Sequence, residues 1–241
     1  MSRLTLFLTR IFLPALVIGG VSALYFTTAT LVPFHPDEST YLYTSQDLHA
    51  WLDGEPANLS YTPATAETRR VYYRLVDPPF AKLMIGLGLA LGNANPPLTD
   101  WRWNIDWESN LAAGSLPDSG ALLAGRLAVQ VWFPLTLLWV YWIGHKFGGV
   151  PTGFLAVLFF GLNALTLLHT RRAMSEGILI FFSALTLTLM LHKPRQFIFA
   201  AAAAALAMNT KVTGAASAGL ALFATCFPVI RISIRQRAIR L

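Results

Sequence analysis

Long apolar runs without charges dominate the pattern of this chain. The first covers residues 11–34, and none of its 24 positions carries an acidic or basic side chain. As a helix rising ~1.5 Å per residue it would reach about 36 Å, which exceeds the ~30 Å hydrocarbon core of a bilayer. It is also longer than the apolar core of a cleaved signal peptide, which favours a retained anchor. Further apolar runs predict membrane-spanning helices at residues 120–144, 150–168, 175–191, 196–208 and 212–230.

Between the first two runs lies a long polar segment, residues 35–119, which contains one shorter apolar run at residues 80–91. Twelve residues are too few to span comfortably, so we predict a helix lying in the membrane interface. The pattern therefore predicts an all-α polytopic membrane protein with about six transmembrane helices and a long first loop that carries interfacial helices. We divide the chain into four parts: 1–34, the N-terminus and first span; 35–119, the loop; 120–230, the five-helix region; and 231–241, a basic tail.

Composition supports the membrane class. Of 241 residues, 55% are hydrophobic and only 12% are charged, and the mean hydropathy is +0.53. Soluble domains carry about 25% charged residues, so this composition excludes a disordered chain and disfavours a soluble enzyme. The net charge of +6 is too sparse to form a basic groove, and we expect no nucleic-acid partner. The single cysteine, Cys226, excludes an internal disulfide or a cysteine-rich zinc module.

The distribution of charge predicts the orientation. Residues 35–119 hold 11 of the 12 acidic residues and five basic ones, so this segment has a net charge of −6 while the rest carries +12. Basic residues in short connections mark the cytoplasmic side. This places the connections 145–149 and 192–195 and the tail inside, and the loop outside. We expect a multi-pass protein of a bacterial inner membrane, a plasma membrane or the endoplasmic reticulum, with its active face periplasmic, extracellular or lumenal.

Three basic residues break this rule, because Arg171, Arg172 and Lys211 fall in connections on the same side as the acidic loop. Cations there indicate an anionic ligand, although lipid headgroups or snorkelling at helix ends would explain them too. At the start of the loop, Asp37 and Glu38 follow Pro36. They are either a general base or cation ligand at the membrane boundary, or acidic residues favoured at a helix N-terminus.

The order of four motifs resembles that of a known family. HPDE follows the first span, DPPFAK precedes the run at 80–91, TRRAMSEGILIFF lies between two later spans, and LAMNTKVTG opens another. This order is similar to that of the dolichyl-phosphate-mannose-protein mannosyltransferase and aminoarabinose transferase superfamily. These proteins are membrane glycosyltransferases of the GT-C class. The resemblance covers nearly all of the chain and corresponds to the N-terminal half of a usual member.

The resemblance implies roles for individual residues. Asp37 matches the acidic residue held to be the catalytic base or its equivalent, and its neighbour Glu38 is the second expected catalytic residue. The expected cations for the donor phosphate are Lys82, Arg171, Arg172 and Lys211. The expected supporting residues are Asp77, which replaces a His or Lys of many relatives, Glu176, which replaces an Asp, and Arg126.

The expected function is transfer of a sugar from a polyprenyl-phosphate carrier to an acceptor hydroxyl on a protein, lipid or glycan, with inversion. The alternative is a truncated or non-catalytic membrane protein that binds a lipid phosphate, such as an accessory subunit or a transporter. The expected partners are membrane lipid, the lipid-linked sugar and the acceptor. Asp37 and Glu38 offer oxygen ligands for a divalent cation, but adjacent residues rarely both bind one ion, so we expect no metal site and no further cofactor.

Overall fold

The computed structural model describes residues 11–55, 59, 69–191 and 197–226. The structure is 78% helical, and no strand occurs among these residues. The predicted all-α class is confirmed. The first ten residues and the predicted basic tail 231–241 lie outside the described part of the chain.

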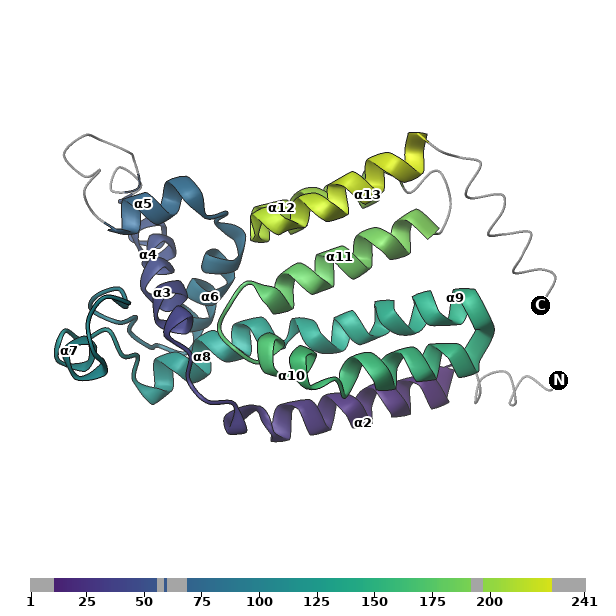
Figure 1. Cartoon of the computed structure of the whole chain (residues 1–241), viewed down its shortest axis with the longest axis horizontal. Helices are drawn as coiled ribbons and strands as arrows, with labels where there is room; N and C mark the ends of the chain where they lie inside the picture. Colours follow the sequence, from purple (N-terminus) through teal and green to yellow (C-terminus); the bar gives the residue numbers. More distant parts are fainter. Residues whose placement is uncertain (1–10, 56–58, 60–68, 192–196, 227–241) are drawn as a thin grey trace.

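Apolar helices run along the long axis and occupy each of the six predicted span ranges (Figure 1). Within the described residues, one helical stretch, Ser119–Gly161, is long and apolar enough to cross a membrane. Four other apolar helices have 10–17 residues. The elements of this region are α2 (Leu13–Thr27), η2 (Ala29–Leu31), α8 (Ser119–Gln130), α9 (Trp132–Gly161), α10 (Ala164–Thr170), α11 (Glu176–Leu191), α12 (Phe197–Thr210), η5 (Val212–Gly214) and α13 (Ala215–Cys226).

Helix α9 is a hairpin of two arms. The chain reverses at Gly148 and Gly149, whose backbone is not helical, and Gly149 has φ +74°, a conformation that favours glycine (Figure 1). The second arm ends at Gly161 rather than continuing through the predicted span 150–168. The reason is Asn163, which caps the separate helix α10 by accepting the backbone N–H groups of Leu165 and Thr166.

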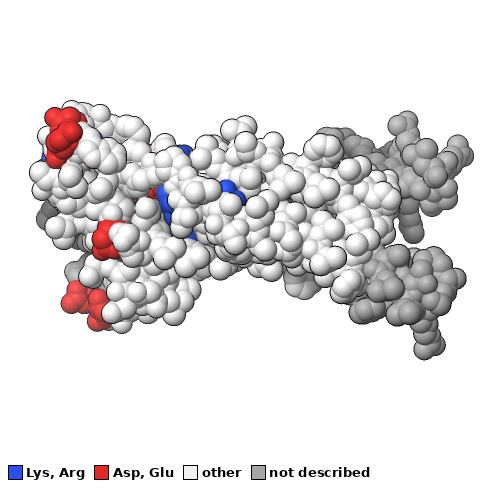
Figure 2. All heavy atoms as spheres, turned by 90° about the horizontal axis from the view of Figure 1, so that it is seen from below, with Lys and Arg blue, Asp and Glu red and all other residues white. Residues whose placement is uncertain are grey.

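The helices of the loop gather at one end of the molecule (Figure 1). A shared core of buried apolar side chains, including Leu42, Ile85, Val129 and Ile178, joins them to the apolar helices. Figure 2 shows acidic side chains at this end, basic ones near the junction, and a largely uncharged surface over the rest of the described face. The loop elements are α3 (Pro36–Thr44), α4 (Gln46–Leu52), α5 (Arg69–Val76), α6 (Phe80–Leu91) and α7 (Trp107–Ala112).

Candidate functional site

The first turn of α3 presents Asp37 to solvent. Pro36 occupies the first turn, where its missing N–H costs nothing, and His35 is the N-cap. The imidazole Nδ1 of His35 accepts the backbone N–H of Asp37 at 3.2 Å, and Glu38 Oε2 accepts the backbone N–H of His35 at 3.0 Å. This reciprocal cap fixes the helix start. It leaves the Asp37 side chain 43% exposed, with Oδ2 3.6 Å from His35 Nδ1.

Glu38, by contrast, is fully buried and joins three segments of the chain. Its Oε1 accepts Arg126 Nε and the backbone N–H of Ala173, both at 2.8 Å, and its Oε2 accepts Arg126 Nη2 at 2.8 Å. Arg126 also donates to the backbone carbonyl of Val32 at 3.0 Å. Both carboxylate oxygens are therefore occupied by protein donors. The geometry favours a structural role for Glu38 over the catalytic one that the resemblance implied, and a supporting role for Arg126.

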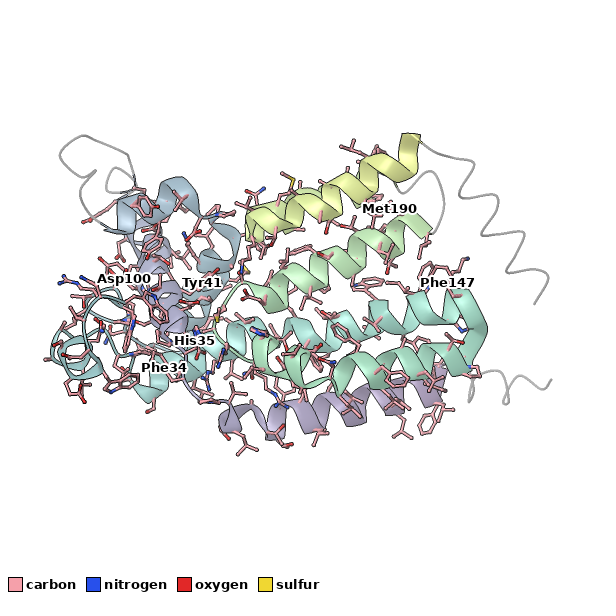
Figure 3. The ribbon with its side chains drawn as sticks, viewed as in Figure 1. Phe34, His35, Tyr41, Asp100, Phe147 and Met190 are labelled. Atoms are coloured by element: carbon pink, nitrogen blue, oxygen red, sulfur yellow. The ribbon has the colours of Figure 1, made fainter. Side chains whose placement is uncertain are left out.

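A cavity of about 160 Å³ lies where the loop end meets the apolar helices. It is formed by three segments: α3, the turn before α6, and the connection between α12 and α13. Figure 3 labels Tyr41 in this junction region, close to His35. The cavity is lined by Tyr41, Asp77, Pro78, Thr210, Lys211, Val212 and Thr213.

Tyr41 contributes the phenol of the cavity wall. It lies four residues after Asp37 and thus on the same face of α3. Its hydroxyl is hydrogen-bonded to Ser175 Oγ at 2.8 Å. Burial raises the pKa of Tyr41 above its usual range, and the nearby carboxylates of Glu176, Asp77 and Asp37 raise it further. The phenol therefore keeps its proton at physiological pH and can donate a hydrogen bond.

Lys211 is the cation of the cavity wall. Its Nζ lies 2.5 Å from Glu176 Oε1, and both side chains are partly exposed, 39% for Lys211 and 20% for Glu176. The other carboxylate oxygen of Glu176, Oε2, is buried and has no hydrogen-bond partner in the described structure. The site thus joins Lys211 with Glu176, which the sequence had treated only as a supporting residue.

The two adjacent arginines differ in their partners. The guanidinium of Arg171 lies 4.9 Å from the ring centroid of Tyr25 and donates to Thr28 Oγ1, so it fixes the end of α2. Arg172 is only 8% exposed, and its side chain makes no hydrogen bond or ion pair within the described residues. Of this pair, only Arg171 is therefore engaged by side-chain partners within the described residues.

Lys82 is buried beneath the turn that precedes α6. Its Nζ donates to the backbone carbonyls of Tyr73 at 3.0 Å and Asp77 at 3.3 Å, and it lies 3.7 Å from Asp77 Oδ2. Burial lowers the pKa of Lys82 below its ordinary value, although the charge of Asp77 opposes this shift. Because the Lys82 ammonium is held by the carbonyls of this turn, its position favours a role in fixing Asp77 at the cavity wall.

Of the expected residues, Asp77 and Lys211 line the cavity, Glu176 is paired with Lys211, and Asp37 lies one helical turn before Tyr41. The other five do not line it: Glu38, Arg126, Arg171 and Lys82 are held by protein partners, and Arg172 is buried. Sequence reasoning missed Tyr41 and its partner Ser175. The four-residue spacing of Tyr41 from Asp37, which is the spacing of one helical turn, was the signal that could have found it. No group of three His, Cys, Asp or Glu side chains with metal-site geometry occurs among the residues described.

The fold and its apolar surface define the class of protein. Large hydrophobic side chains of the described helices, such as Phe159 at 76% and Ile198 at 77%, are exposed over an uncharged surface. Such extensive apolar exposure is typical of helices that face lipid. The site at one end of this surface is therefore the site of a helical membrane protein.

Comparison with known proteins identifies the family. The family model described as dolichyl-phosphate-mannose-protein mannosyltransferase matches residues 61–237. The chain belongs to this family of membrane-embedded GT-C glycosyltransferases, as the sequence motifs had predicted. Neither the curated proteins nor the solved structures that were searched gave a match. The matched range begins after α3, so the assignment of Asp37 rests on its motif and on its place one helical turn before Tyr41, which lines the cavity.

Proposed function

We propose that the chain transfers a sugar from a polyprenyl-phosphate carrier to an acceptor hydroxyl, with inversion, at the outer face of a membrane. The observation that carries this proposal is the cavity itself, because it combines the Lys211 ammonium with the face of α3 that bears Asp37 and Tyr41. The family name indicates a dolichyl-phosphate-mannose donor and a protein acceptor. We therefore place mannose and a protein hydroxyl first, ahead of lipid or glycan acceptors.

In this proposal the donor phosphate binds at Lys211 and its lipid tail extends along the apolar surface. The acceptor oxygen attacks the anomeric carbon, and the bond between that carbon and the phosphate oxygen breaks. The acceptor proton passes to the Asp37 carboxylate, whose exposure leaves it accessible to an incoming hydroxyl. One such displacement inverts the anomeric centre.

Negative charge grows on the phosphate as it leaves, and fixed cations and donors stabilise that charge. Lys211 supplies a cation, Arg172 is the second candidate, and the phenol of Tyr41 is a neutral donor in the same wall. The buried pair of Glu38 and Arg126 holds the first turn of α3 against the segment that follows Arg172. The proposed step assigns no role to a metal ion or to another cofactor.

The test compares sugar transfer from a polyprenyl-phosphate sugar by the full chain in lipid nanodiscs. We expect Asp37→Asn to lower kcat by about 10²- to 10⁴-fold, the range typical of a lost general base. Lys211→Ala should lower kcat/KM by about 10²-fold or more, because it removes a fixed charge from the leaving phosphate.

Each matched control removes a charge of the same sign at an exposed position away from the cavity. Asp53→Asn alters an exposed carboxylate at the end of α4, and Lys146→Ala an exposed ammonium beside the α9 turn. Both should keep the wild-type rate. Equal turnover in Asp37→Asn and wild type would overturn the assigned base. Donor binding by wild type without any turnover would instead favour a lipid-phosphate-binding protein without catalytic activity.

A further inference from the structure

The ion pair between Lys211 and Glu176 presents a problem for phosphate binding. The ammonium that lines the cavity is already countered by a carboxylate 2.5 Å away. Asp77 also lines the cavity, and the charges of Glu176, Asp77 and Asp37 all act on the phenol of Tyr41. An entering phosphate therefore meets several carboxylates and has to share the ammonium with Glu176.

The carboxylate of Glu176 is only half satisfied. Its Oε1 accepts from Lys211, while the buried Oε2 has no partner among the described residues. A buried acceptor without a donor is costly, so the pair is not an optimised structural salt bridge. Lys211, at 39% exposed, can turn toward a ligand without unfolding its surroundings.

The two lipid phosphates of the proposed reaction differ in charge. The donor is a phosphodiester with a single negative charge, whereas the product is a monoester with about −1.5 to −2 at pH 7, because its second pKa is about 6. A site made only of cations would therefore hold the product more tightly than the donor. A fixed carboxylate beside the ammonium repels the more highly charged product more strongly.

We propose that Glu176 is a competing anion that shares Lys211 with the lipid phosphate and thereby speeds release of the product. This inference rests on the proposed function and adds a role for Glu176 in it. Glu176 acts through Lys211 and is a positioning residue. The ammonium turns from Glu176 to the phosphate when the donor binds and returns to Glu176 when the product leaves.

The test uses farnesyl phosphate, a short isoprenoid monoester, and the full chain in nanodiscs, with binding followed by tryptophan fluorescence. We expect Glu176→Gln to bind farnesyl phosphate about tenfold more tightly than wild type, as expected when a close competing charge is removed. In the Lys211→Gln background the same substitution should change Kd by less than about twofold, because the shared cation is gone.

Kinetics and controls complete the test. Glu176→Gln should slow multiple turnover relative to single turnover, because tighter binding of the monoester delays release of the product. Glu176→Asp, which retains the charge, should remain close to wild type, and Glu108→Gln, an exposed carboxylate in α7, should not alter binding. Helical circular dichroism confirms that each variant is folded.

The outcomes separate this inference from the proposed function. Unchanged or weaker binding of farnesyl phosphate by Glu176→Gln overturns the inference alone. If only the sugar-bearing donor binds more weakly, Glu176 contacts the sugar and the competing-anion role is again overturned. If wild type binds neither farnesyl phosphate nor the donor, the proposed function fails and the inference fails with it.

Discussion

At the scale of single residues, neighbouring acidic side chains have opposite environments. Asp37 is 43% exposed on one face of α3, while Glu38 is fully buried and bound to Arg126 and Ala173. The sequence offered acidic residues at a helix N-terminus as one of two interpretations, and both residues do lie in the first turn of α3. It could not separate their roles, because the partners of Glu38 lie 88 and 135 residues away and no local pattern links them.

The buried pair of Glu38 and Arg126 gives a prediction for stability. Replacing Glu38 by Gln, or Arg126 by Met, leaves one buried partner without its counter-charge and should lower the free energy of unfolding by about 3–5 kcal/mol. Chemical denaturation in detergent, followed by helical circular dichroism, measures this change.

The double variant with Glu38→Gln and Arg126→Met provides the check. Both charges are then absent, so its destabilisation should be smaller than the sum of the two single effects. Additive losses would mean that the two side chains contribute independently, contrary to the geometry.

At the scale of elements, apolar run length predicted where helices occur but not how they meet. The six predicted spans and the run at 80–91 all contain helices, since each depends only on local composition. The positions of helix ends that depend on capping residues were harder to predict from the sequence. The single predicted span 150–168 is interrupted because Asn163 caps α10. The cavity was not predictable either, since α3, the Asp77 turn and the Lys211 connection meet only in three dimensions.

The contact between α6 and α8 gives a second prediction for stability. A Cβ on Gly88 would lie 2.6 Å from Ala128 Cβ and 2.7 Å from the backbone oxygen of Ala124. Gly88→Ala should therefore separate the two helices and cost about 1–3 kcal/mol, as overpacking does. The same denaturation measurement applies.

Gly19 in α2 is the matched control, because nothing lies within 4 Å of the position its Cβ would take. Both glycines are helical and gain equally in helix propensity on change to Ala. Gly19→Ala should thus be neutral or slightly stabilising. A Gly88→Ala variant as stable as Gly19→Ala would show that α6 and α8 are not tightly packed.

At the scale of the whole molecule, the loop helices and the α9 turn lie at opposite ends (Figure 1). The connections that contain Arg171, Arg172 and Lys211 lie at the loop end. Ala173 and Ser175 bond to Glu38 and Tyr41 of α3, and Lys211 lines the cavity together with Tyr41. This arrangement is the one that the charge pattern predicted, since the acidic loop and these cations were assigned to one side. The membrane orientation itself remains a prediction.

Cysteine labelling tests that orientation. In a Cys226→Ser background, Trp103→Cys and Phe147→Cys replace side chains that are 65% and 51% exposed at the two ends. On sealed cells, an impermeant maleimide should label the Trp103→Cys variant directly and the Phe147→Cys variant only after the membrane is opened. The reverse pattern would place the proposed site on the cytoplasmic side.

The buried contacts of Glu38 have a consequence for synthesis. Ala173, whose N–H completes the Glu38 site, is made 135 residues after Glu38. At about 5–20 residues per second, this interval lasts roughly 7–27 s. During that time the nascent chain carries a carboxylate without its final partners at the membrane boundary. The set of hydrogen bonds around Glu38 is therefore complete only after Ala173, which follows α10, has been synthesised.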